Sequence, residues 1–184
     1  MNLVIIGIGL LPLLRLVILG YQDDLTANPI EFITRSTGTW ALVFLCITLS
    51  ISPLRKISGW SNLIKYRRTC GLMVFFYACI HFSIWFWLDH DLSITEMLKD
   101  VVKRPFITMG FSAFVLLIPL VLTSNRWAVQ QLKRSWAKLH RLVYVIAVLV
   151  ILHYFWHKSG KNDFQTVSIY AFVIGSLLLY RLKK

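Results

Sequence analysis

Acidic residues are scarce in this chain, and charged residues of either sign are few. The 184 residues include 8 Asp and Glu against 20 Lys and Arg, and charged side chains make up 15% of the sequence whereas hydrophobic ones make up 57%. With a mean hydropathy of +0.66, this composition is too apolar for a soluble domain of this size and is typical of a multi-span membrane protein. The net charge of +12 would indicate nucleic acid in a soluble protein. Here the basic residues cluster in particular loops, so we expect membrane lipid and no nucleic acid as a partner.

Cysteine is rare as well. The three cysteines, Cys46, Cys70 and Cys79, form neither C-x-x-C nor C-x-x-C-H, which excludes covalent haem attachment by the usual c-type motif and a conventional zinc ribbon. We interpret them as small buried hydrophobic residues. The chain also lacks G-x-G-x-x-G and a Walker loop, so it shows no flavin or nucleotide motif of its own. No internal repeat is apparent.

Long apolar runs recur six times. We therefore predict an all-α bundle of six transmembrane helices that forms a single domain over residues 1–184. The spans are expected near 3–19, 37–51, 71–88, 107–123, 139–156 and 167–182. The first run has no basic region before it and no clear A-x-A cleavage site, so we expect a retained span. The second run is short, and an extension through Pro53 is the alternative.

The basic residues predict the orientation of this bundle. Thirteen of the 20 Lys and Arg lie in three connections, at 55–68, 126–141 and 181–184. These connections fall on one side of a six-span bundle. Because cytoplasmic loops carry the excess of Lys and Arg, both termini are predicted to be cytoplasmic.

Histidines inside the apolar runs are the candidate functional residues. His81 lies within 71–88 and His153 within 139–156. An ionisable side chain at that depth is costly and usually serves a function, and histidine is a standard axial ligand of haem iron. On the expected topology both lie at comparable depth in the outer half of the membrane. We therefore predict that the two imidazoles clamp one iron, which would relay electrons because it has no open position.

His140 opens the fifth run and suggests a second haem or an alternative site. It lies thirteen residues before His153, about 20 Å along a helix, and thirteen steps of an ideal helix turn by about 220°. A straight helix would therefore not aim both rings the same way. Curvature, side-chain reach or haems on different flanks all stay open. The alternative for each histidine is a hydrogen bond to a neighbouring helix.

Several short motifs resemble a known family. In chain order they are GTWAL at 38–42, SPLR at 52–55, YRRTCGL at 66–72, His81, KRPFITMG at 103–110, TSN at 123–125, WAKLHRLVY at 136–144 and His153. With these motifs the chain resembles the haem-binding membrane subunit of the bacterial periplasmic protein-methionine-sulfoxide reductase system, the MsrQ family, which belongs to the ferric-reductase-like transmembrane domains. The resemblance covers nearly the whole chain.

The resemblance implies the metal ligands. In the wider group, spans three and five each supply two histidines, thirteen or fourteen residues apart, which hold two stacked haems. Span five matches with His140 and His153, but span three keeps only His81, and Arg67 stands fourteen residues earlier. An inner haem would be ligated by His140 alone, be ligated by His140 with an unusual partner, or be absent. Arg67 and Arg68 are ordinary positive-inside residues or hold haem propionates or a flavin phosphate.

The resemblance also implies the function: a cytochrome b of the bacterial inner membrane with one or two haem b groups, and possible FMN because family members are described as FMN proteins. Electrons would come from the quinone pool, a flavin or a flavin reductase. They would pass to a periplasmic molybdopterin methionine-sulfoxide reductase that repairs oxidised periplasmic proteins. The chain would be an electron-transfer subunit without catalytic residues. The alternatives are a proton-relay transporter or channel, and a membrane anchor without a redox role.

Overall fold

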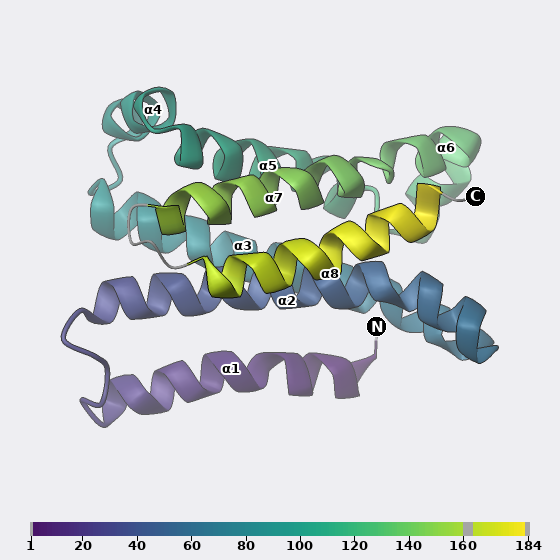
Figure 1. Cartoon of the computed structure of the whole chain (residues 1–184), viewed down its shortest axis with the longest axis horizontal. Coiled ribbons are helices and arrows are strands. Elements are labelled where there is room, and N and C mark those ends of the chain that lie inside the picture. Colours follow the sequence, from purple (N-terminus) through teal and green to yellow (C-terminus); the bar gives the residue numbers. More distant parts are fainter. Residues whose placement is uncertain (1, 160–163, 183–184) are drawn as a thin grey trace. The chain divides into compact units, whose positions relative to one another are not determined.

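The computed structural model describes residues 2–159 and 164–182, and in that part of the chain the regular secondary structure is all helical, without strands (Figure 1). The all-α prediction is therefore confirmed. The α-helices are α1 (Leu3–Tyr21), α2 (Pro29–Ser58), α3 (Ile64–Ile84), α4 (Ile94–Lys103), α5 (Pro105–Leu122), α6 (Arg126–Leu139), α7 (Leu142–Ser159) and α8 (Gln165–Leu182). A short 3-10 helix, η1 (Ser61–Leu63), precedes α3, and a π-helical turn, η2 (Trp85–Asp89), continues it.

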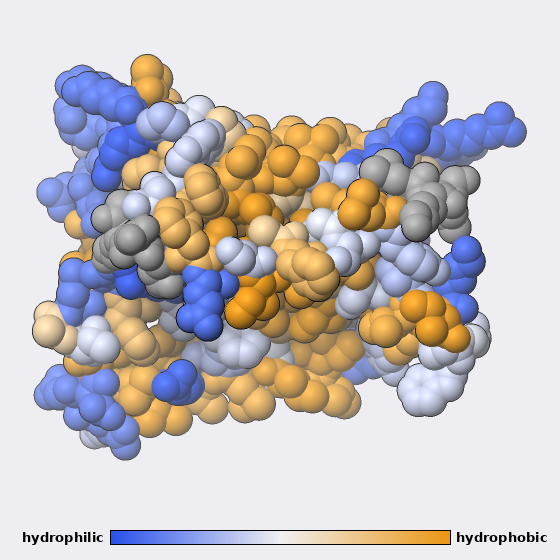
Figure 2. Space-filling model, in the orientation of Figure 1, coloured by the Kyte–Doolittle hydropathy of each residue, from blue (hydrophilic) through white to orange (hydrophobic). Residues whose placement is uncertain are grey.

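Within the described residues, five helical segments are long and apolar enough to cross a membrane: α1, α2, α3 with its two short extensions, α5 and α7. Figure 2 shows hydrophobic residues over the middle parts of the helices and hydrophilic residues near their ends. The protein is therefore a multi-pass membrane protein. The sixth predicted span, 167–182, corresponds to α8, which is helical but is not among these five. The six-span count and the cytoplasmic termini stay predictions.

The chain forms two compact units, residues 1–97 and 98–184. We call them the N-terminal unit and the C-terminal unit. The single domain expected over 1–184 stays a prediction.

In the N-terminal unit α2 and α3 pack antiparallel, and α1 contacts both. Tyr77 of α3 is fully buried, and its hydroxyl donates a 2.6 Å hydrogen bond to the carbonyl oxygen of Gly9 on α1. The Tyr77 ring stacks on Phe44 of α2 with centroids 5.7 Å apart. A Cβ atom at Gly9 would lie 2.9 Å from the Met73 Cε atom. Glycine thus permits the close approach of α1.

Helix α2 is twice as long as the predicted span 37–51, and it continues through Pro53. Its start is fixed by Asn28, whose side chain accepts a 3.2 Å hydrogen bond from the Glu31 amide, with Pro29 in the first helical position. Both features are typical helix starts. Its end is fixed by Gly59, which adopts a left-handed conformation with φ +73°.

Two helices, α4 and α6, lie where the sequence predicted only connections. Each is amphipathic rather than apolar, so neither stands out as a membrane span. In α4 only one face is covered, and Met97 is its buried residue. In α6 the side chain of Asn125 caps the first turn by accepting from the Ala128 amide at 2.7 Å.

The placement of His140 on the helix that bears His153 is wrong. Helix α6 ends at Leu139 and α7 begins at Leu142, so His140 lies in the turn between them. The ideal-helix rotation of about 220° between the two rings therefore does not apply, because the helix is interrupted there.

In the C-terminal unit α5 and α7 pack antiparallel along their length, with contacts between 106 and 153 at one end and between 123 and 140 at the other. The cap of α5 repeats that of α2 in one respect, because Pro105 opens it. Helix α8 also packs on α7, and the Arg181 guanidinium donates to the Tyr144 hydroxyl at 2.7 Å.

Candidate functional site

His81 is held against the start of α2. Its Nδ1 atom lies 2.9 Å from the carbonyl oxygen of Thr34. A carbonyl oxygen only accepts, so Nδ1 carries the hydrogen, and in the neutral ring Nε2 then carries the lone pair. One turn further along α2, a Cβ atom at Gly38 would lie 3.0 Å from His81 Cε1 and 3.1 Å from Nδ1. The imidazole therefore occupies the space that a side chain at residue 38 would need.

His153 has the same relation to the start of α5. Its Nδ1 atom lies 2.7 Å from the carbonyl oxygen of Phe106, which again assigns the hydrogen to Nδ1 and the lone pair to Nε2. A Cβ atom at Gly110 would lie 2.7 Å from Nδ1 and 2.9 Å from Cε1. The ring is thus pressed against the glycine even more closely than His81 is.

The two arrangements are equivalent residue by residue. In each, a helix carbonyl at position i accepts from the imidazole, a glycine at i+4 leaves room for the ring, and the histidine follows the carbonyl residue by 47 positions. We call this pair of positions the carbonyl–glycine notch: Thr34 with Gly38 on α2, and Phe106 with Gly110 on α5. Although the sequence shows no repeat, the local geometry is duplicated.

His140 is bound through its other nitrogen. Its Nε2 atom lies 2.9 Å from the Thr123 hydroxyl oxygen, which itself lies 2.6 Å from the Pro119 carbonyl oxygen. The hydroxyl donates its one hydrogen to that carbonyl, so His140 Nε2 is the donor to Thr123. Trp136 stacks on the His140 ring with centroids 4.0 Å apart and donates its indole hydrogen to the Thr123 carbonyl at 3.0 Å.

The arginines predicted as cofactor-binding residues lie at the start of α3. Arg67 Nη1 donates to the Ser52 hydroxyl at 3.5 Å. Arg68 lines an open cavity of about 340 Å³, which it shares with Asn2, Lys65, Tyr66 and Thr69. Two cationic side chains in one cavity suit an anionic group.

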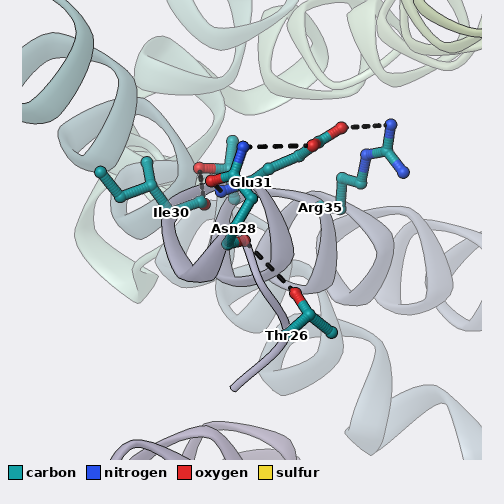
Figure 3. Close-up of polar contacts among 6 residues, drawn as sticks. Thr26, Asn28, Ile30, Glu31 and Arg35 are labelled. Atoms are coloured by element: carbon teal, nitrogen blue, oxygen red, sulfur yellow. Dashed lines mark hydrogen bonds and ion pairs between the residues drawn. The ribbon is translucent and has the colours of Figure 1, made fainter.

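Arg35 is a cation that the sequence analysis did not select. It lies three residues before Gly38, on the same side of α2, and it forms an ion pair with Glu31 at the capped start of the helix (Figure 3). The Nη2 atom makes that ion pair at 2.5 Å, whereas the Nε atom is buried without a hydrogen-bond partner among the described residues. The Nε atom of Arg35 is therefore the donor left for an acidic ligand.

Comparison with known proteins places this arrangement in a family. The family model described as "Ferric reductase like transmembrane component" matches residues 37–151. A relative from Herminiimonas arsenicoxydans, named "Protein-methionine-sulfoxide reductase heme-binding subunit MsrQ", is 58% identical over 94% of this chain and 80% of its own length. The chain belongs to the MsrQ family. Relatives of the same name from Bordetella pertussis and Xanthomonas campestris pv. campestris are 52% and 43% identical, over 94% and 89% of this chain and 84% and 74% of their own lengths.

No solved structure matches the chain. The matched range of the ferric-reductase-like family includes both glycines of the notches, His81 and His140, and ends two residues before His153. The MsrQ relatives cover most of the chain, so the family assignment extends across both units.

The donor set of this MsrQ-family chain fits a porphyrin iron better than a bare ion. In residues 2–159 and 164–182 no three His, Cys, Asp or Glu side chains gather as metal ligands would. Imidazoles on separate helices, such as those of His81 and His153 with a backbone carbonyl orienting each ring, suit a haem iron, because the macrocycle itself supplies the remaining ligands.

Sequence reasoning missed the residues that orient the histidines. Both notch glycines stand in motifs that carried the family resemblance, GTWAL and KRPFITMG. A glycine inside an apolar helical run is a signal for a close approach. Which side chain approaches it depends on the pairing of helices, and that is visible only in the structure.

Proposed function

We propose that this chain is a membrane cytochrome b that relays electrons across the bacterial inner membrane to a periplasmic molybdopterin methionine-sulfoxide reductase, for repair of oxidised periplasmic proteins. The name that its relatives bear supports the haem and the reductase system. The observation that supports the proposal most is the matched orientation of His81 and His153, each with its hydrogen on Nδ1 and its lone pair on Nε2.

His81 and His153 would hold haem b through their Nε2 atoms in this proposal. The Thr34 and Phe106 carbonyls accept the Nδ1 hydrogens, which fixes each ring and raises the basicity of the ligating nitrogen. Haem, when bound, supplies one-electron redox chemistry. Two imidazole ligands leave no open position, so the chain transfers electrons and holds no substrate at the iron.

A reduced-minus-oxidised spectrum of the purified protein tests the proposal. We expect sharp b-type bands from the wild type and their loss from His81→Ala and from His153→Ala, with His90→Ala as the control. His90 packs against Trp85, with ring centroids 4.8 Å apart, outside the apolar part of α3. A colourless wild type after haem-sufficient expression would refute the proposal.

The same variants test whether both imidazoles share one iron. If they do, each single substitution removes the entire low-spin ferric signal in an electron paramagnetic resonance spectrum. If each ligates its own iron, each substitution removes only part of it. The prediction of one shared iron follows from the sequence-based topology, and the spectrum decides it.

His140 belongs to a second or alternative haem site in this proposal. Ligation through Nε2 requires its hydrogen bond to Thr123 to break, since one nitrogen cannot both donate a hydrogen to the hydroxyl and give its lone pair to iron. A second haem should therefore have lower occupancy than the first, as a haem-to-protein ratio between one and two. His140→Ala should return the ratio to one.

FMN, if held, is expected at the start of α3, where Arg68 and Lys65 share the cavity of about 340 Å³ and Arg67 stands beside them. Guanidinium groups pair well with a phosphate. The electron donor is the quinone pool, a flavin or a flavin reductase. Arg68→Gln should lower the flavin-to-protein ratio without changing the b-type bands, and unchanged flavin would contradict this placement.

The outer connections, near 21–36 and 89–104, are the proposed contacts for the periplasmic reductase. A proton-relay transporter or a plain anchor is the alternative function. An anchor would keep its partner active in the His153→Ala variant, whereas an electron relay would not. A transporter would be colourless.

A further inference from the structure

We infer that Gly38 and Gly110 are positioning residues for the metal-ligating imidazoles, and that each carbonyl–glycine notch is a device that fixes the tautomer and the tilt of one axial histidine. The inference rests on the proposed function, because it assigns the surroundings of the same two ligands. It adds residues that neither the relatives' names nor the family description assigns.

Helix geometry explains why a glycine must follow the carbonyl by four residues. In an α-helix the carbonyl at i points toward the amide of i+4, and every Cα–Cβ bond leans toward the helix N-terminus. The Cβ atom of residue i+4 therefore stands beside the carbonyl oxygen of residue i. Without that Cβ atom, the oxygen can accept a second hydrogen bond from a ring on the neighbouring helix.

The distances show that the ring uses this opening. At Gly110 an added Cβ would come within 2.7 Å of the atom of His153 that makes the hydrogen bond, Nδ1. At Gly38 it would come within 3.1 Å of His81 Nδ1. These are ring atoms held by the hydrogen bond itself, so neither can yield as the end of a flexible side chain could.

Recurrence argues against an accident of packing. The N-terminal and C-terminal units each contain one notch, near the start of the first helix of an antiparallel pair, and each notch holds a histidine near the end of the second. His140 provides the contrast. It is bound to a threonine hydroxyl through Nε2 and none of the described glycines lies against it. The two notches therefore set His81 and His153 apart from His140 among the three candidate ligands.

Alanine at the notch glycines tests the inference. We expect Gly110→Ala to weaken haem retention by about 10- to 100-fold, the usual effect of losing the hydrogen bond that orients a metal ligand. Gly38→Ala should have a smaller effect, because its contacts are 3.0 Å and longer. Retention is measured by transfer of haem to excess apomyoglobin, and the ring orientation by the g values of the ferric protein.

Other helical glycines supply matched controls. A Cβ atom at Gly71 on α3 would meet only Thr48 Cγ2 at 3.8 Å, and one at Gly7 on α1 would meet nothing within 4 Å. Alanine is a better helix former than glycine, so Gly71→Ala and Gly7→Ala should fold and retain haem as the wild type does. If Gly110→Ala and Gly38→Ala match these controls in retention and g values, the inference is overturned.

A second measurement addresses the carbonyl and avoids any steric change at the notch. In His153→Gly the Phe106 carbonyl stays exposed to an added ligand. Imidazole can donate a hydrogen to it, whereas 1-methylimidazole has a methyl group instead. When haem is supplied together with either ligand, we expect imidazole to restore the low-spin spectrum at a concentration about tenfold lower than 1-methylimidazole does. Equal restoration by the two ligands would overturn the inference.

These results are distinguishable from failure of the proposed function. A wild type without haem, or alanine variants of His81 and His153 that keep all of their haem, would overturn the proposed function and this inference with it. The inference alone would be overturned by a different result: the wild type holds haem and the histidine variants lose it, but neither the glycine variants nor the methyl group of 1-methylimidazole changes haem binding.

Discussion

At the residue scale, hydrogen-bond direction separates the three histidines. His81 and His153 donate from Nδ1 to carbonyls, whereas His140 donates from Nε2 to a hydroxyl. Because each neutral ring has one hydrogen, these bonds decide which nitrogen can bind a metal. Position along the sequence sets His140 apart by its expected depth, but it does not give the direction of its hydrogen bond.

Thr123→Val tests the bond that holds His140. The substitution removes the hydroxyl and keeps the side-chain volume, so it should lower the free energy of unfolding by about 1 kcal/mol. It should also raise the haem-to-protein ratio, because His140 no longer has to exchange the hydroxyl for a metal. Thermal unfolding in detergent and pyridine haemochrome content measure the two effects. An unchanged ratio would contradict a haem site at His140.

Arg35→Gln tests whether the Arg35 guanidinium, whose Nε atom lacks a hydrogen-bond partner among the described residues, faces a haem propionate. Removing one positive charge near the haem stabilises the ferric form, so the midpoint potential should fall by tens of millivolts, on the order of 1 kcal/mol. Redox titration in detergent measures it, with Arg35→Lys as the variant that keeps the charge. An identical potential in all three proteins would show that Arg35 does not face the haem.

How far the sequence predicts the site is also decided residue by residue. His81 and His153 stand out because an ionisable group in a long apolar run is rare. The notches could not be predicted, since Gly38 and Gly110 are ordinary glycines until α3 and α7 are known to pack against them. The Thr123–His140 bond was hidden for a related reason, because the predicted span 139–156 placed His140 inside a helix, whereas it lies in the turn between α6 and α7.

At the element scale, the apolar elements were predicted well and the amphipathic ones were not. The predicted span 3–19 ends two residues before α1 does, and the predicted span 107–123 starts two residues after α5 and ends one residue after it. Helices α4 and α6 were missed because hydropathy finds lipid-facing helices and is blind to short helices with one polar face.

The end of α2 offers a prediction about the backbone. Gly59 has φ +73°, and a Cβ atom there would meet nothing within 4 Å. Gly59→Ala should therefore destabilise the protein by about 1–2 kcal/mol through backbone strain alone. Thermal unfolding measures it. Gly59→Asn should lose less stability than Gly59→Ala, because asparagine tolerates the left-handed region. An equal loss of stability in the two variants would contradict backbone strain as the cause.

At the scale of the whole molecule, the number of spans decides where the C-terminus lies. If α8 crosses the membrane, both termini share one side, and the distribution of Lys and Arg places that side in the cytoplasm. A green fluorescent protein fused after Lys184 should then fluoresce, and an alkaline phosphatase fused there should be inactive. The reverse pattern would leave α1, α2, α3, α5 and α7 as the only spans among the described residues.

A fusion after Asn125 is the control for that experiment. Residue 125 lies between α5 and α6, before α8, so its side of the membrane is the same whether α8 crosses or not. The two fusions should agree for six spans and disagree for five.

The duplicated hairpins have a consequence for protein engineering. Since the carbonyl and the glycine against each imidazole lie on the helix that packs antiparallel to the histidine's own helix, a designer could transplant such a helix pair, with its carbonyl–glycine notch, into an unrelated bundle. Two such transplanted pairs, facing each other across a porphyrin, would make a minimal synthetic electron carrier. Its design would depend on keeping a glycine opposite each histidine.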